Sequence, residues 1–148
     1  MIEMNVYLSG EIHSNWREEI VSGCVEHNLP VSFLTPVVTH EASDNAGDAL
    51  GKEDQSFWKD HKSAKLNAIR IQKGINDADL VVVKFGEKYR QWNAAFDAGY
   101  AAAIGKPYLV IHPDEFTHAL KEVDAQAYGV ASDEQQVIEI LKYLTTQK

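Results

Sequence analysis

The stretch DLVVVKF, residues 79–85, decides the fold of this chain. Five of its seven residues are apolar and three of these are β-branched valines in a row, as is typical of a strand inside a parallel sheet that is covered on both faces. Residues 4–8 and 31–34 have the same character, residues 108–111 predict a fourth strand, and residues 128–130 predict a short edge strand. Helix-length segments separate these strands. The alternation predicts an α/β fold, a three-layer doubly wound parallel sheet of four to five strands in the flavodoxin-like order 2-1-3-4-5.

The segments between the strands differ in how clearly they predict helices. Apolar residues at helical spacing predict helices over residues 16–25, 64–75, 92–104, 115–123 and 137–144. Residues 37–62 are mostly polar, and we expect a long loop there whose end packs onto the rest of the chain through Phe57 and Trp58. The chain has no internal repeat and no linker-like tract, so residues 1–148 are expected to form a single domain.

Charge and cysteine content restrict the function. The chain has 14 Lys and Arg against 22 Asp and Glu, a formal net charge of −8, and no basic stripe for the phosphates of a nucleic acid polymer or for an anionic membrane surface. It has no apolar run long enough to cross a bilayer and no signal-peptide pattern. A single cysteine, Cys24, cannot form an intrachain disulfide, which fits a reducing compartment. We therefore expect a cytoplasmic protein that binds a small molecule, with no nucleic acid and no membrane partner.

Motifs for common cofactors are missing. The sequence contains neither G-x-G-x-x-G nor G-x-x-x-x-G-K-[ST], which argues against a dinucleotide or nucleoside triphosphate site. The six histidines are scattered without an H-E-x-x-H pair, and the acids of residues 40–48 lack the spacing of a calcium loop. We expect no cofactor and no metal.

The most informative segment is GEKYRQWNAAFDAGYAAAIGKP, residues 86–107. Its predicted helix is rich in alanine and glycine, and Asp97 is the single acid on this small-sided element. If the helix begins near Asn93, its positive end favours an ionised carboxylate at Asp97. The spacing alone leaves a second interpretation open, in which Asp97 is an ordinary solvent-facing residue of a packing helix.

Three stretches resemble the nucleoside 2-deoxyribosyltransferase superfamily. The pattern acid-x-Gly-x-Ala-x-Ala-x-Gly-Lys-Pro runs from Asp97 to Pro107. The sequence VYLSG of residues 6–10 is similar to the first strand and turn of that superfamily, and INDADLVVV of residues 75–83 is similar to its third strand and the helix end before it. More narrowly, residues 85–97 resemble the branch called YtoQ.

The resemblance implies an enzyme that acts at the N-glycosidic bond of a nucleoside or nucleotide, by base exchange or by hydrolysis. In the superfamily a carboxylate at the position of Asp97 attacks the anomeric carbon and holds a covalent glycosyl intermediate, and the tyrosine at the position of Tyr7 helps to place that carboxylate. An ionised carboxylate fixed close to the anomeric carbon is what such a double displacement requires. The alternative is a non-catalytic protein that binds a nucleotide or sugar phosphate in the same pocket.

In this topology the ligand crevice lies where the strand order reverses, between the loops that follow the first and third strands. These loops border it, the long polar stretch would supply a lid, and basic residues would attract an anionic ligand. The expected substrate-binding residues are Ser9, Gly10, Glu11, Trp58, His61, Arg70, Gly86, Trp92 and Asn93. A tryptophan among them would either stack on a base or simply pack against its neighbours.

The helix predicted over residues 92–104 also bears on assembly. Ala95, Gly99 and Ala103 recur at a spacing that brings backbones close, and superfamily members commonly assemble. We expect a homo-oligomer, most simply a two-fold dimer, with this helix and the one before it at the interface. The alternative is that the alanines pack only on the sheet of their own chain.

Overall fold

The computed structural model describes residues 1–36 and 40–146. Its five parallel strands form one sheet in the order β2-β1-β3-β4-β5, which confirms the predicted order. The strands are β1 (Met4–Gly10), β2 (Val31–Leu34), β3 (Leu80–Lys84), β4 (Tyr108–Ile111) and β5 (Gly129–Ala131). The predicted edge strand is present as β5, one residue later than expected.

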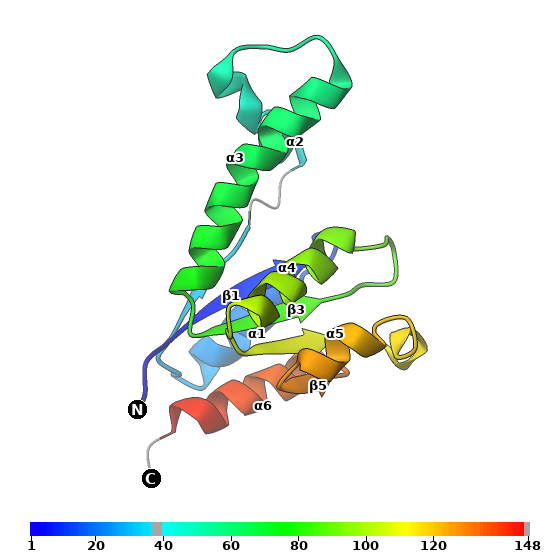
Figure 1. The fold of residues 1–148 in the computed structure, drawn as a ribbon. Coiled ribbons are helices and arrows are strands. Elements are labelled where there is room, and N and C mark those ends of the chain that lie inside the picture. Colours follow the sequence, from blue (N-terminus) through cyan, green and yellow to red (C-terminus); the bar gives the residue numbers. More distant parts are fainter. Residues whose placement is uncertain (37–39, 147–148) are drawn as a thin grey trace.

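Helices cover both faces of this sheet, as the predicted three layers require (Figure 1). One face carries α1 (Trp16–Glu26) and α6 (Glu134–Thr145), and the other carries α3 (Ser56–Asp77), α4 (Trp92–Ala103) and α5 (Lys121–Gln126). A 3-10 turn, η2 (Asp114–Phe116), precedes α5. Within the described residues, no helix is long and apolar enough to cross a membrane.

Alternation along the strands divides the core in two. Val6 and Leu8 of β1 point into the core under α1 and α6, whereas Tyr7 points to the face of α3 and α4. The same alternation along β3 buries Val81 and Val83 beneath α3 and α4. Because successive side chains of a strand point to opposite faces, Ser9 follows Tyr7 onto the α4 side. Tyr7 and Ser9 therefore lie on the same side of the sheet, the side covered by α4.

The region between β2 and β3 differs from the expected long loop. It contains α2 (His40–Asp44) and the 3-10 helix η1 (Ala46–Leu50), and α3 begins at Ser56 rather than near residue 64. Figure 1 shows this part, together with the first half of α3, extending beyond the sheet. We call residues 40–63 the arm. Residues 37–39 of the expected loop lie outside the described part of the chain.

Polar contacts explain why the sequence pattern did not reveal the arm. Ser63 is buried, and its hydroxyl donates to the carbonyl of Asp44 at 2.6 Å and accepts from the amide of Gly47 at 3.1 Å. Asn67 donates to the carbonyl of Ser43 at 3.1 Å and to its hydroxyl at 3.0 Å. Hydrogen bonds of this kind hold α2 and η1 onto α3, so the segment carries no apolar period from which helices could be predicted.

Candidate functional site

The candidate site lies at the carboxyl ends of β1 and β3, where the strand order reverses. The two strands pair through Gly10 and Lys84, and the amide of Glu11 continues the ladder by donating to the carbonyl of Lys84 at 3.0 Å. Gly10 has a φ of +112°, and a Cβ at this position would collide with the backbone of Lys84. Gly10 therefore permits the sharp turn out of β1, because a side chain there would be strained and would clash.

A buried hydrogen bond joins this turn to α4. The hydroxyl of Ser9 donates to Oδ2 of Asp97 at 2.6 Å, and the two side chains are 0% and 7% exposed. Burial raises the pKa of Asp97 above its ordinary value, and the hydrogen bond from Ser9 partly lowers it again. The structure thus places Asp97 inside the molecule, on the face of α4 that meets the sheet.

Tyr7 lies next to this pair and is also buried. Among the described residues its hydroxyl is a buried polar group without a hydrogen-bond partner, an uncommon situation inside a protein. Burial raises the pKa of Tyr7 far above its usual range, the nearby negative charge of Asp97 adds to the rise, and the positive charges of Arg17 and Arg70 partly offset it. Tyr7 is therefore neutral at physiological pH, so its hydroxyl keeps the proton that it can donate in a hydrogen bond.

Close packing from α3 fixes the ring of Tyr7. A Cβ at Gly74 would lie 2.5 Å from Cε2 of the tyrosine ring, too close for any real side chain. Ile75, the next residue of α3, is completely buried in the same core. Gly74 therefore lets α3 approach the ring, which leaves Tyr7 little freedom to swing away from Asp97.

Glu11 braces the loop between β1 and α1. It is only 4% exposed, and its carboxylate accepts hydrogen bonds from the amide of His13 and the hydroxyl of Ser14. Gly86, from the loop after β3, lies against its side chain so closely that a Cβ there would overlap it. The loops that follow β1 and β3 are therefore in contact, as predicted from the topology. The carboxylate of Glu11 binds groups of its own loop, His13 and Ser14.

The remaining predicted residues are exposed and differ in how far they lie from Asp97: Asn93 precedes it by one turn of α4, whereas Trp58 and His61 lie near the start of α3. Trp92 is 74% exposed and Asn93 is exposed as well, both in the first turn of α4. Trp58 and His61 stand in the first turns of α3, in ring contact with each other and with Phe57. Trp58 precedes Gly74 by sixteen residues, or about 24 Å of helix. Arg70 is exposed on α3, near enough to Tyr7 for its charge to affect the pKa of that residue.

The structure also adds residues that the sequence did not single out. Arg17 of α1 is 9% exposed and donates to three backbone carbonyls at the end of β1. Gln91 accepts from the amide of Gly86 at 3.0 Å and so closes the loop that precedes α4. An arginine on the first turn of a helix is typical of a solvent-facing residue, so the sequence carried no signal of the role of Arg17.

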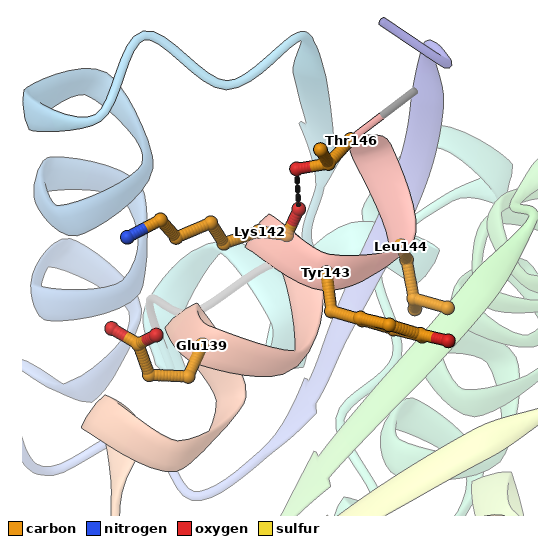
Figure 2. A pocket seen from close by; sticks show the side chains of 5 residues that line it. All are labelled: Glu139, Lys142, Tyr143, Leu144 and Thr146. Atoms are coloured by element: carbon orange, nitrogen blue, oxygen red, sulfur yellow. Dashed lines mark hydrogen bonds between the residues drawn. The ribbon is translucent and has the colours of Figure 1, made fainter. Parts of the chain in front are cut away.

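Two surface hollows lie elsewhere on the molecule. One is at the end of α6 and is lined by Glu139, Lys142, Tyr143, Leu144 and Thr146 (Figure 2). The other is at the amino end of β1, beside residues 29–32. Neither includes a residue of the Tyr7, Ser9 and Asp97 group. In the described ranges, no three His, Cys, Asp or Glu side chains gather in a way that could hold a metal ion.

The fold and the site together define a class: a parallel α/β protein with a buried, hydrogen-bonded carboxylate beside the point where its strand order reverses. A model of the family described as nucleoside 2-deoxyribosyltransferase YtoQ matches residues 7–145. The chain is 44% identical over 144 residues to the YtoQ protein of Bacillus subtilis (strain 168), covering 97% of each. The chain belongs to this family, as its sequence resemblance indicated.

Solved structures with low sequence identity share the fold. The CMP N-glycosidase BcmB of Clostridium botulinum superposes with a TM-score of 0.53 and 11% identity, covering 94% of this chain and 98% of that one. A 2-deoxyribosyltransferase of Bacillus psychrosaccharolyticus gives a TM-score of 0.52 and 14% identity over 90% of each chain. At these identities the likeness is one of fold.

Proposed function

We propose that this protein cleaves the N-glycosidic bond of a nucleoside or nucleotide through a covalent intermediate on Asp97, and transfers the sugar to another base or to water. The observation that carries the proposal is the buried hydrogen bond between Ser9 and Asp97 at the switch point of the sheet. Membership of the nucleoside 2-deoxyribosyltransferase YtoQ family supports it. The two named structures of the same fold, a glycosidase and a deoxyribosyltransferase by name, are compatible with this class of bond.

The proposed mechanism is a double displacement. With Oδ2 held by Ser9, Oδ1 of ionised Asp97 attacks the anomeric carbon while the bond from that carbon to the base nitrogen breaks, and the base leaves with the electron pair and takes up a proton from solvent. A second base or a water molecule then attacks the same carbon, loses its proton to solvent, and releases the carboxylate. Two inversions at one carbon retain its configuration. The neutral hydroxyl of Tyr7, buried beside Asp97, would help to place the carboxylate.

We also propose that the active form is a homo-oligomer in the cytoplasm. Ala94, Ala98 and Ala101 of α4 are buried on the sheet of their own chain, so part of the small-residue pattern serves internal packing. The opposite stripe of α4 is exposed and apolar; it comprises Trp92, Phe96, Gly99 and Ala103. In a two-fold pair of antiparallel α4 helices, the aromatic half of each stripe would face the small half of the other.

The chain's one cysteine, Cys24, is buried, and burial raises the pKa of its thiol to about 11. The thiol is therefore protonated at physiological pH and unreactive.

A chromatographic assay tests the catalytic proposal. The protein is incubated with deoxynucleosides, ribonucleosides and their monophosphates, with and without a second free base, and released or exchanged base is measured. We expect turnover of at least one substrate class, its loss in Asp97→Asn, and a sugar adduct on Asp97 by mass spectrometry after rapid acid quenching. As a matched control, Asp114→Asn replaces an exposed aspartate of η2. Binding by calorimetry without any turnover would instead favour a non-catalytic nucleotide-binding protein.

A further inference from the structure

The end of β1 has backbone groups that no strand satisfies. Pairing of β1 with β2 stops at Tyr7 and Leu34, whereas pairing with β3 continues to Gly10. The amide of Met4 donates to the carbonyl of Pro30, on the β2 side, and the carbonyl of Asn5 accepts from Asp79, on the β3 side. Because backbone groups alternate along a strand, the carbonyls of Leu8 and Gly10 point toward the side where β2 has already ended.

The side chain of Arg17 occupies that side. Nε donates to the carbonyl of Leu8 at 3.2 Å, and Nη2 donates to the carbonyl of Gly10 at 3.3 Å. Nη1 donates to the carbonyl of Glu11 at 2.6 Å. The planar fork of the guanidinium presents several donors in fixed directions, which one ammonium group cannot do. Arg17 therefore takes the place of the missing strand at Leu8 and Gly10 and also binds the carbonyl of Glu11.

The surroundings hold Arg17 in this position. Its guanidinium lies over the ring of Trp16 at 4.6 Å from the ring centre, and Nε1 of Trp16 donates to the carbonyl of Glu11 at 2.6 Å. In the described part of the chain Arg17 makes no ion pair within 4 Å. Burial lowers its pKa, and the negative charges of Glu11 and Glu18 partly offset that effect. A buried charge is costly unless its hydrogen bonds are made, so the three carbonyls supply the direct partners that its burial requires.

The residue enclosed by these three carbonyls is Ser9, the hydrogen-bond donor to Asp97. We infer that Arg17 is a positioning residue for the candidate site: it fixes the turn on both sides of Ser9 and so keeps the Ser9 hydroxyl on Oδ2 of Asp97. The inference rests on the proposed function only in taking Asp97 as the reacting group. Ser9 thereby acts on the carboxylate of Asp97.

Titration of Asp97 by carbon-13 NMR tests this inference without any substrate. The variants are Arg17→Met, Ser9→Ala and the double variant, with Asp97→Asn to assign the signal. If Arg17 acts through Ser9, each single variant raises the midpoint of Asp97 by about one pH unit, and the double variant raises it no further because the same hydrogen bond is lost. Lys121→Met, which removes an exposed positive charge from α5, leaves the midpoint unchanged.

Two results would overturn the inference. An unchanged midpoint in folded Arg17→Met shows that the turn holds Ser9 without Arg17. Additive shifts in the double variant show that Arg17 acts on Asp97 by its charge alone and not through Ser9. If Arg17→Met does not fold by circular dichroism, Arg17→Lys is titrated alone and with Ser9→Ala under the same criteria, since it keeps the charge but not the fork.

The outcome is separable from that of the proposed function. A wild-type protein that turns over no nucleoside, yet shows the non-additive shifts, refutes the reaction and keeps the role of Arg17. An active protein whose Asp97 keeps the wild-type midpoint in the arginine variants supports the reaction and refutes the role of Arg17. Where activity is found, we expect kcat to fall in Arg17→Met with KM nearly unchanged, because the hydrogen bond to Asp97 positions the reacting group and does not bind substrate.

Discussion

The carboxyl edge of the sheet and the arm differ in which side chains they bury: the first buries polar side chains and the second exposes apolar ones. Around Asp97 the polar side chains of Ser9, Glu11 and Arg17 are buried, and each is held by specific hydrogen bonds. In the arm and the first turns of α3 the large apolar side chains are outside: Leu50 is 66% exposed and Phe57 is 67% exposed. Burying polar groups costs free energy unless their hydrogen bonds are made, whereas a group of exposed apolar side chains marks a candidate contact surface. The first region fits the proposed chemistry and the second fits the proposed association.

The largest expected effect comes from removing the charge of Asp97. We expect Asp97→Asn to lower turnover by more than about 10³-fold, because the amide cannot form the glycosyl ester. Its thermal midpoint should nevertheless rise by a few degrees. Burial raises the pKa of Asp97, so the ionised form is disfavoured in the folded protein and its cost is felt above that pKa. Calorimetry at pH 7.5 and the base-release assay check both halves; a less stable Asp97→Asn protein would mean that the carboxylate supports the fold.

Two glycines sharpen the contrast between tight and open packing. Gly74→Val would push a side chain into the ring of Tyr7, and we expect a loss of about 1–3 kcal/mol in the free energy of unfolding. Gly99 is also helical, on the exposed stripe of α4, and a Cβ there would have no neighbour within 4 Å. Gly99→Ala should therefore raise the free energy of unfolding by about 0.5–1 kcal/mol. Urea denaturation of both variants is the measurement, and equal effects would contradict the packing described at Tyr7.

The pH dependence of turnover gives a further test of the buried pair. The reaction needs ionised Asp97, so kcat/KM should fall as the pH decreases through the pKa of this residue. Burial places that fall at a higher pH than for an ordinary aspartate, and Ser9→Ala should move it higher still, because the lowering hydrogen bond is lost. Ser14→Ala, which removes a hydroxyl bound to Glu11 instead, is the matched control. A profile that is the same in all three proteins would remove Asp97 from the rate-determining chemistry.

The smallest expected effect concerns the surface of the arm. Phe57→Ser and Trp58→Ser remove exposed rings that are in ring contact with each other and with His61, so the stability of a single chain should change by less than about 0.5 kcal/mol. The proposed oligomer is tested separately. Light scattering of the wild-type protein over a dilution series measures its size, and Phe96→Ser on the exposed stripe of α4 is expected to dissociate it. A 16.5 kDa particle at micromolar concentration in the wild-type protein would reject the oligomer.

The sequence by itself determined the sheet and its order. An apolar, β-branched run such as residues 79–85 can be buried only between two helical layers, so strand, layer and topology follow from local pattern and chain connectivity. The YtoQ family membership was likewise visible in residues 85–97. The sequence also singled out Asp97 as the one acid on a small-sided helix, because a charge at such a position departs from the pattern around it.

The tertiary structure alone decided which polar groups meet. Ser9 and Asp97 are 88 residues apart, and their contact depends on the order of the strands and the position of α4 over β1. Arg17 binds the carbonyls of Leu8 and Gly10 because β2, only four residues long, ends at Leu34 and leaves them without a strand partner. Likewise α3 extends about 24 Å from Gly74 to Trp58, which carries Trp58 and His61 away from the site they were expected to cover. Hydrogen bonds between distant segments have no period along the chain, and for that reason only the folded molecule reveals them.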